Sequence, residues 1–276
     1  MSRIVDCSLF YNEFDLLSLR LKLLYDHVDE FVLVESTHTF QGNPKSTQLK
    51  DEWDRFSQYH DKMRYVLYDE IPSDNAWEND YGQRNAIMQG LHDAHPDDII
   101  IIGDADEIVR PCIIQQMKDD DRDIMGFRTP YFNFKYNYML INDPEAYCVW
   151  ITACKKKLLD SPQKLRDSRF NLTTLPYNYD DGQIKMYEHA GWHFTYLGDD
   201  EFIRNKIRSF AHTELNYPEF IEQIDVQTAM ENGKGFNPLD PRTFVPVKYT
   251  DYFPDDLPPD FLISGEFSPL HYLPKD

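Results

Sequence analysis

The sequence has few basic residues, few cysteines and no long apolar run. Its 28 lysines and arginines are outnumbered by 48 acidic residues, which gives a formal net charge of −20 at pH 7. A surface with this charge repels the phosphates of nucleic acids and anionic lipids, so we expect no nucleic-acid partner. No segment approaches the ~20 consecutive apolar residues that a transmembrane helix needs.

The four cysteines form no Cys-x-x-Cys pair, so neither a disulfide framework nor a zinc site is indicated. The first residues lack the apolar core of a signal peptide, because Asp6 interrupts their apolar run. We therefore expect a soluble, cytoplasmic protein with reduced thiols. The sequence carries no indication of its oligomeric state.

The chain does contain what a folded domain needs, with 41% hydrophobic and 14% aromatic residues. Its first hundred residues alternate between two periodicities. Strand-like apolar runs at 4–10, 31–34, 65–68 and 99–102 are separated by helix-like segments at 15–27, 51–61 and 80–94. This order predicts an α/β fold with a mostly parallel, Rossmann-like sheet flanked by helices.

We predict a single domain over residues 1–276, with an α/β half at 1–110 and a second half at 111–232. The second half includes an aromatic-rich stretch at 125–140, a strand-like run at 147–153 and a helical pattern at 200–212. Frequent prolines after residue 233 predict an extended, loop-rich tail at 233–276.

Polar residues follow several of the predicted strands, where an α/β sheet binds its ligands. Asn12 and Glu13 follow the first strand, Glu35 the second, and Asp104 and Asp106 the fourth. Two carboxylates at a strand end suit Mn²⁺ or Mg²⁺ shared with a nucleotide diphosphate. A solvated acidic turn is the alternative interpretation of the same pair.

Two further interpretations of this region remain open. Arg84, on the helix before the fourth strand, is either a ligand for the nucleotide or a surface arginine. An Asp-x-Asp pair also occurs in phosphatases of the haloacid dehalogenase type, but their nucleophilic aspartate ends the first strand. The position after the fourth strand disfavours a phosphatase.

Several motifs together resemble glycosyltransferase family 17, the β-1,4-mannosyl-glycoprotein β-1,4-N-acetylglucosaminyltransferases. They are spread in order along the chain, at 12–17, 28–32, 34–44, 102–108, 190–193 and 267–273, with Glu201 and Lys206 after the fifth. The resemblance implies a GT-A type fold, UDP-N-acetylglucosamine as donor, Mn²⁺ or Mg²⁺ as metal, a glycan acceptor with a β-linked mannose, and inversion at the anomeric carbon. It also implies that residues 1–110 are the nucleotide-sugar-binding half and residues 111–232 the acceptor and catalytic half.

On this resemblance, Asp106 is assigned to the metal and Asp104 to the metal or the ribose. We expect Asn12, Glu13, Glu35 and Arg84 to bind the donor, and Lys206 either to bind the diphosphate or to face solvent. His193 and His271 are candidate third metal ligands, since a neutral imidazole suits Mn²⁺; a structural histidine is the alternative for each.

An inverting transfer also needs a base for the acceptor hydroxyl. The candidates are Glu201, which matches a family motif, then Asp200 and Glu188. Trp192 is a candidate stacking surface for an acceptor sugar, or a core residue.

Two other functions fit the same residues. One keeps the fold but uses another nucleotide sugar, with a polysaccharide or lipid-linked acceptor. The other is a non-catalytic protein that binds a nucleotide sugar or a carbohydrate.

Overall fold

The computed structural model describes residues 2–175, 182–237 and 240–248. The chain divides into two compact units, each of which is discontinuous in sequence. The first comprises Met1–Arg128 and Val149–Gly191, and the second comprises Thr129–Cys148 and Trp192–Asp276. Strands β6 (Ile124–Asn133), β8 (Tyr147–Lys155) and β10 (Gly191–Thr195) each run from one unit into the other.

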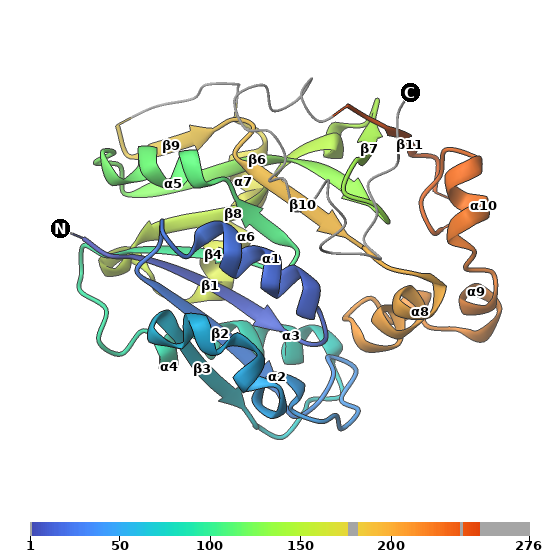
Figure 1. The fold of residues 1–276 in the computed structure, drawn as a ribbon, viewed down its shortest axis with the longest axis horizontal. Coiled ribbons are helices and arrows are strands. Elements are labelled where there is room, and N and C mark those ends of the chain that lie inside the picture. The colour runs from blue at the N-terminus through green and yellow to red at the C-terminus, as the bar shows by residue number, and fades with distance from the viewer. Residues whose placement is uncertain (1, 176–181, 238–239, 249–276) are drawn as a thin grey trace. The chain divides into compact units, whose positions relative to one another are not determined.

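The first unit is built on four parallel strands that lie side by side in the order β4, β1, β2, β3 (Figure 1). Their bounds are Ile99–Gly103, Ile4–Phe10, Glu30–Ser36 and Met63–Tyr68, respectively. Strand β8 pairs antiparallel with β4, so the sheet is mixed. The predicted α/β class and the four parallel strands are confirmed.

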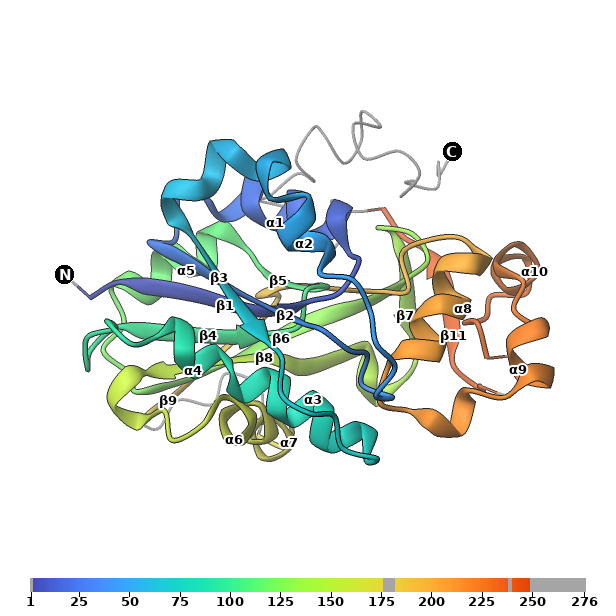
Figure 2. The ribbon, with the colours of Figure 1, turned by 90° about the horizontal axis from the view of Figure 1, so that it is seen from below.

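The helices of this unit cover both faces of the sheet, as Figure 2 shows. Helix α1 (Phe14–Leu24) lies on one face with α2 (Gln48–Asp51), and α3 (Ala76–Asn85) and α4 (Ile87–Gly90) lie on the other. The remaining elements are the 3₁₀ helices η1 (Trp53–Lys62) and η3 (Lys156–Leu158), helices α5 (Pro111–Lys118), α6 (Pro162–Asp167) and α7 (Arg169–Thr173), and strands β5 (Glu107–Val109) and β9 (Ile184–Tyr187).

The core of the first unit follows from strands that are apolar on both faces. All seven residues of β2 are buried, as the short continuous apolar run predicted. Alternate residues such as Val5, Cys7 and Val32 pack with Ile87 and Leu91 from the α4 side of the sheet. The residues between them face α1 instead, because successive side chains of a strand point to opposite faces.

Two predicted helices differ from those observed. The segment at 80–94 forms α3 and α4 instead of one helix, and α3 begins earlier because the Asn75 side chain accepts a hydrogen bond from the Trp77 backbone N–H. The segment at 51–61 is mostly the 3₁₀ helix η1. It is kinked at Phe56, whose backbone angles are non-helical.

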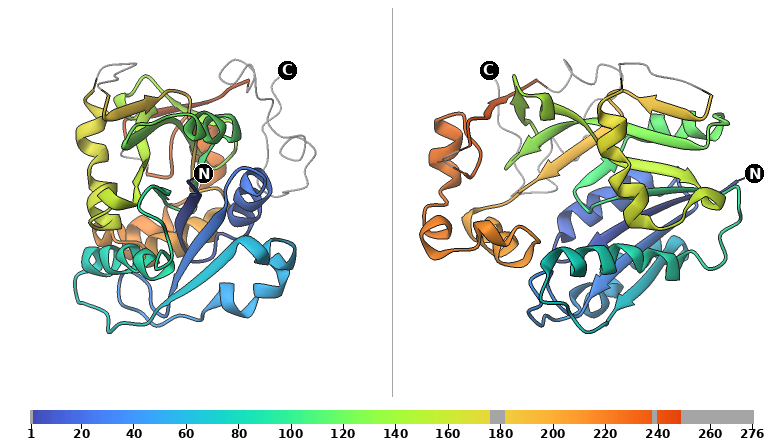
Figure 3. Two further views of the ribbon diagram at one scale, coloured as in Figure 1. Left: turned by 90° about the vertical axis from the view of Figure 1, so that its left-hand side faces the viewer. Right: turned by 180° about the vertical axis from the view of Figure 1, so that it is seen from behind.

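The second unit carries the aromatic-rich segment and the helices that follow β10, drawn in orange in Figure 3. Strand β7 (Tyr138–Ile141) pairs antiparallel with β6 and with β11 (Thr243–Pro246), and β10 pairs parallel with β6. The other elements are η2 (Pro144–Ala146), α8 (Asp200–Ser209), η4 (Thr213–Leu215), α9 (Pro218–Glu222) and α10 (Val226–Glu231). The predicted tail therefore includes one strand, and its part at 249–276 lies outside the described residues.

None of the helices in the described ranges has the length and apolar character of a membrane span.

Gly191 provides a test of the close packing between β5 and the start of β10. A Cβ atom at Gly191 would lie 2.1 Å from the Ile108 carbonyl oxygen, so no side chain fits there. We expect Gly191→Ala to lower the free energy of unfolding by about 3 kcal/mol, as overpacking of a tight contact does.

Gly182→Ala is the matched control, because Gly182 has a positive φ of +80° but no atom within 4 Å of its added Cβ. It should cost only about 1 kcal/mol of backbone strain. Urea unfolding of both variants measures the difference, and equal losses would contradict the packing argument.

Candidate functional site

The acidic turn between β4 and β5 closes on itself through backbone hydrogen bonds. The backbone N–H of Asp104 donates to the Glu107 carboxylate at 2.9 Å, and the N–H of Glu107 donates to the Asp104 carbonyl at 3.0 Å. The turn follows β4, whose carboxyl end lies beside that of the parallel strand β1. It therefore occupies the edge of the sheet at which α/β folds bind ligands.

Two arginines bind the carboxylate of Asp104. Arg84 of α3 donates to one oxygen at 3.0 Å, and Arg166 of α6 donates to the other at 2.8 Å. Burial alone would raise the pKa of Asp104, but the charges of Arg166 and Arg84 outweigh it and hold that pKa far below its ordinary value. Asp104 is therefore an ionised anchor for two guanidinium groups.

Arg166 also fixes the far end of the turn. It donates to the Glu107 carboxylate at 2.7 Å and to the Trp150 carbonyl, and it is only 3% exposed. Burial would lower the pKa of its guanidinium, but Asp104 and Glu107 raise that pKa further above its ordinary value. Sequence analysis missed Arg166, because nothing in a short amphipathic helix marks an arginine as buried.

A third arginine reaches the turn from the other face of the sheet. Arg20 of α1 forms two hydrogen bonds to the Asp6 carboxylate, at 2.6 and 2.7 Å. It also donates to the backbone carbonyls of Asp104 and Glu107, both at 2.9 Å. The signal for this contact was Asp6 itself, since a carboxylate within a strand buried on both faces needs a partner.

Arg84, a predicted donor ligand, is buried and engaged on several sides. Besides Asp104 it donates to Asp80 at 3.0 Å and to Gln163 at 2.6 Å. Burial and the nearby charge of Asp104 raise the pKa of Asp80, against the opposing effect of Arg84. In this structure Arg84 therefore links α3 to α6 and to the acidic turn, and its contact with a donor stays a prediction.

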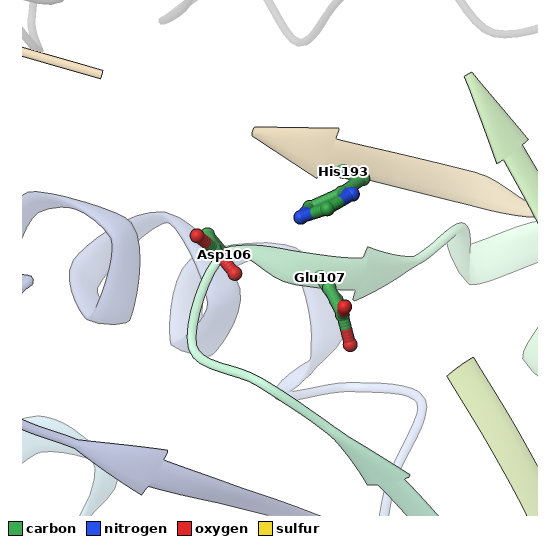
Figure 4. Close-up of side chains that lie close together, drawn as sticks. All are labelled: Asp106, Glu107 and His193. Atoms are coloured by element: carbon green, nitrogen blue, oxygen red, sulfur yellow. The ribbon is translucent and has the colours of Figure 1, made fainter. Parts of the chain in front are cut away.

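Figure 4 labels three side chains that carry metal-binding groups, Asp106 and Glu107 of the first unit and His193 of the second. Asp106 precedes β5 and Glu107 begins it, whereas His193 is the third residue of β10. All three are buried. The Glu107 carboxylate accepts a hydrogen bond from Arg166 at 2.7 Å.

Two other predicted donor ligands support loops. The Glu13 carboxylate accepts hydrogen bonds from the backbone N–H groups of Tyr11 and Asn12, at 3.1 and 3.2 Å, and so closes the turn after β1. The Glu35 carboxylate is fully buried and accepts hydrogen bonds from Leu49 and Lys50. Asn12 lies in the turn after β1 that Glu13 closes.

The predicted base candidates occupy different surroundings. Glu201 lies in the first turn of α8 with its side chain 70% exposed, 3.3 Å from Arg208. Asp200 accepts a hydrogen bond from the Val226 backbone N–H at 2.8 Å, which ties α8 to α10. Glu188, in the first unit, lies 3.6 Å from Arg128.

The remaining predicted residues belong to the second unit. Trp192 is buried and stacks with Phe194 at 6.0 Å between ring centroids, so much of its ring is in the core. Lys206 places its ammonium 5.2 Å from the ring centroid of Tyr196. The His193 ring meets Tyr131 edge-on at 4.8 Å. His271 lies outside the described residues.

Comparison with known proteins identifies a family for most of the chain. The family model described as "Glycosyltransferase family 17" matches residues 1–250. The β-1,4-mannosyl-glycoprotein 4-β-N-acetylglucosaminyltransferases of Rattus norvegicus and Homo sapiens are each 34% identical over 115 residues, which is 38% of this chain. The matched segment is 21% of the rat protein and 22% of the human protein, so the chain spans about a fifth of their length.

One solved structure shows a remote similarity, the galactosyltransferase LgtC in complex with donor and acceptor sugar analogs. The match covers 66% of this chain and 72% of that one, with 13% identity and a TM-score of 0.36. A TM-score this low does not establish a common fold.

The arginine contacts of the turn predict a large effect of one substitution. Arg166→Met removes a partner from the buried carboxylate of Glu107 and from the half-buried carboxylate of Asp104, which should lower the free energy of unfolding by about 3–5 kcal/mol. Arg55→Met is the control, because the ion pair of Arg55 with Asp15 is half-exposed and should contribute less than about 1 kcal/mol. Urea unfolding measures both, and a loss for Arg166→Met no larger than the control would refute the role of Arg166.

Proposed function

Because this chain belongs to glycosyltransferase family 17, we propose that it is a metal-dependent, inverting glycosyltransferase of the GT-A type. The donor is UDP-N-acetylglucosamine and the acceptor is a glycan hydroxyl, with β-linked mannose as the best candidate. The names of the relatives support the sugar and the acceptor. The observation that carries the proposal is the rigid acidic turn at the carboxyl edge of the parallel strands.

The metal is Mn²⁺ or Mg²⁺, and Asp106 with His193 is the ligand pair we propose. The side chains present fit such an ion, since a carboxylate oxygen and a neutral imidazole nitrogen both suit Mn²⁺. When bound, the ion neutralises charge on the departing diphosphate.

The buried arginines and Asp104 hold the acidic turn in its conformation. The carboxylate of Asp104 already accepts hydrogen bonds from Arg84 and Arg166. A contact of Asp104 with the metal or the ribose would be made in addition to these bonds. Its side chain is 35% exposed, which leaves an edge open to a ribose hydroxyl. Asp104 and His271 stay in the proposal as further candidate ligands beside Asp106, which the family resemblance assigns to the metal.

Glu201 is the proposed base, with Asp200 and Glu188 as the alternatives. An inverting base must be able to reach the acceptor hydroxyl and take its proton. The exposed carboxylate of Glu201 can do so without breaking a backbone contact, whereas Asp200 holds the Val226 N–H. Trp192 and Lys206 remain candidates for contacts with the acceptor and the diphosphate.

Calorimetry with UDP-N-acetylglucosamine, UDP-glucose, UDP-galactose and GDP-mannose, in Mn²⁺ and in EDTA, tests the donor site. We expect selective binding of one UDP-sugar that requires the metal. Asp106→Asn should weaken this binding by at least about 100-fold, since even outer-shell changes at metal sites reach that size. Asp121→Asn is the control, because that side chain is 95% exposed. If the wild-type protein binds none of the four, the donor assignment is wrong.

Transfer to a β-mannoside acceptor tests the base and separates an enzyme from a binding protein. Glu201→Gln should lower the turnover rate by about 10²- to 10⁴-fold and leave UDP-sugar binding unchanged, because general base catalysis acts only on the chemical step. Glu219→Gln, at an exposed position of α9, should have no effect. Full activity of Glu201→Gln would move the base to Asp200 or Glu188, and binding without turnover by the wild type would indicate a non-catalytic protein.

A further inference from the structure

Lys45, in the loop after β2, carries a buried ammonium group that the mechanism above does not use. Its side chain is only 8% exposed, and its Nζ has no hydrogen-bond partner among the described residues. The nearest acidic oxygen, on Glu35, lies 4.0 Å away, and the ring centroid of Tyr11 lies 5.1 Å away. An ammonium group has three N–H donors, and a buried donor that forms no hydrogen bond costs free energy.

The loop holds Lys45 in place through its backbone. The N–H of Lys45 donates to the Thr37 carbonyl at 2.9 Å, and the N–H of Thr39 donates to the Asn43 carbonyl at 2.8 Å. On the opposite side, the Asn79 side chain donates to the Phe40 carbonyl at 2.8 Å. The backbone that carries Lys45 is therefore held by hydrogen bonds within the protein.

Glu35 does not satisfy this lysine, because other groups engage its carboxylate. Leu49 and Lys50 donate to it through their backbone N–H groups, and Tyr65 donates through its hydroxyl at 2.9 Å. Burial lowers the pKa of Lys45, while the charges of Glu35 and Glu13 partly oppose that shift. The ammonium thus lies near two carboxylates without a hydrogen bond to either.

We propose that Lys45 recognises the nucleobase of the donor nucleotide by donating a hydrogen bond to the 4-carbonyl oxygen of uracil. This inference rests on the proposed function, because it takes the bound ligand to be a nucleotide sugar. A diphosphate is disfavoured at Lys45, since Glu35 and Glu13 repel its negative charge. An uncharged carbonyl oxygen carries no such penalty.

The topology places Lys45 at a suitable distance from the acidic turn. Strand β1 lies between β4 and β2, and Tyr11 directly follows β1 while Lys45 lies in the loop that follows β2. Neighbouring strands are about 4.8 Å apart, so the ends of β4 and β2 are separated by about 10 Å along the sheet edge. A diphosphate bound at the turn after β4 would extend its nucleoside along this edge toward Tyr11 and Lys45.

The chemistry predicts a choice between bases. Uracil presents a carbonyl oxygen at the position where cytosine presents an amino group, which is a donor and cannot accept from an ammonium. Lys45 should therefore favour UDP over CDP, whose bases differ at the 4-position and in the hydrogen on the adjacent N3. A hydrogen bond that discriminates between bases contributes about 1–3 kcal/mol, which corresponds to a preference of about 5- to 150-fold.

Calorimetric titration of the full chain with UDP and with CDP, in Mn²⁺, tests the inference. Wild type should prefer UDP within that range, and Lys45→Met should bind UDP more weakly and lose the preference. Lys50→Met is the matched control, because its exposed side chain lies in the same region and only its backbone contacts Glu35.

A second readout separates recognition from a structural role. Lys45→Met replaces an ammonium without hydrogen bonds by an apolar side chain of similar length, so the urea midpoint should not fall. Equal wild-type binding of UDP and CDP, or an unchanged UDP preference in Lys45→Met, would overturn the inference while leaving the glycosyltransferase proposal intact. If wild type binds no nucleotide at all, the proposed function itself fails and the inference falls with it.

Discussion

The first unit depends on the binding of one acidic turn by three buried arginines that come from three different helices. Arg20 of α1 holds the turn's carbonyls, while Arg84 of α3 and Arg166 of α6 hold its first carboxylate. Each arginine has a further buried partner, so no charge in the cluster is left alone. Removing one arginine would leave a buried charge without its partner, which strongly destabilises a folded protein.

This arrangement explains why the turn suits a reaction centre. A site that binds a polyanionic donor through a cation needs its ligands held in place before the donor arrives, because ordering them at that moment would weaken binding. The buried arginine contacts supply that order from both faces of the sheet. Helices α1 and α3 lie on opposite faces, and both contact the same four-residue turn.

Along the whole sheet edge, the acids that hold the loops are different residues from those that we propose to bind ligands. After β1, Glu13 closes a turn; after β2, Glu35 anchors the following loop; after β4, Asp104 anchors the arginines. Each of these acids was predicted to contact the donor directly, and each has protein partners in the structure. The side chains that we propose for ligand contact, Asp106 and Lys45, are neighbours of these anchors.

Much of this could be predicted from the sequence, because local patterns carry it. Period-two and continuous apolar runs identified the four parallel strands, and the acidic pair after the fourth of them located the candidate site. The antiparallel pairing of β8 with β4 could not be predicted, because its residues are more than forty positions from their partners in β4. The split of α3 and α4 was also missed, since the periodicity of the segment does not report where a helix is interrupted.

The sequence by itself determined the four parallel strands and their succession along the chain, the place of the acidic turn and the family resemblance. Only the tertiary structure decided which acids are anchors, because that depends on which distant side chain reaches each oxygen. Arg166 is 62 residues from Asp104 along the chain, and no spacing rule links them. The buried position of Lys45 has the same origin: a loop closed by its own backbone hydrogen bonds carries the ammonium to the carboxylate of Glu35 and the ring of Tyr11.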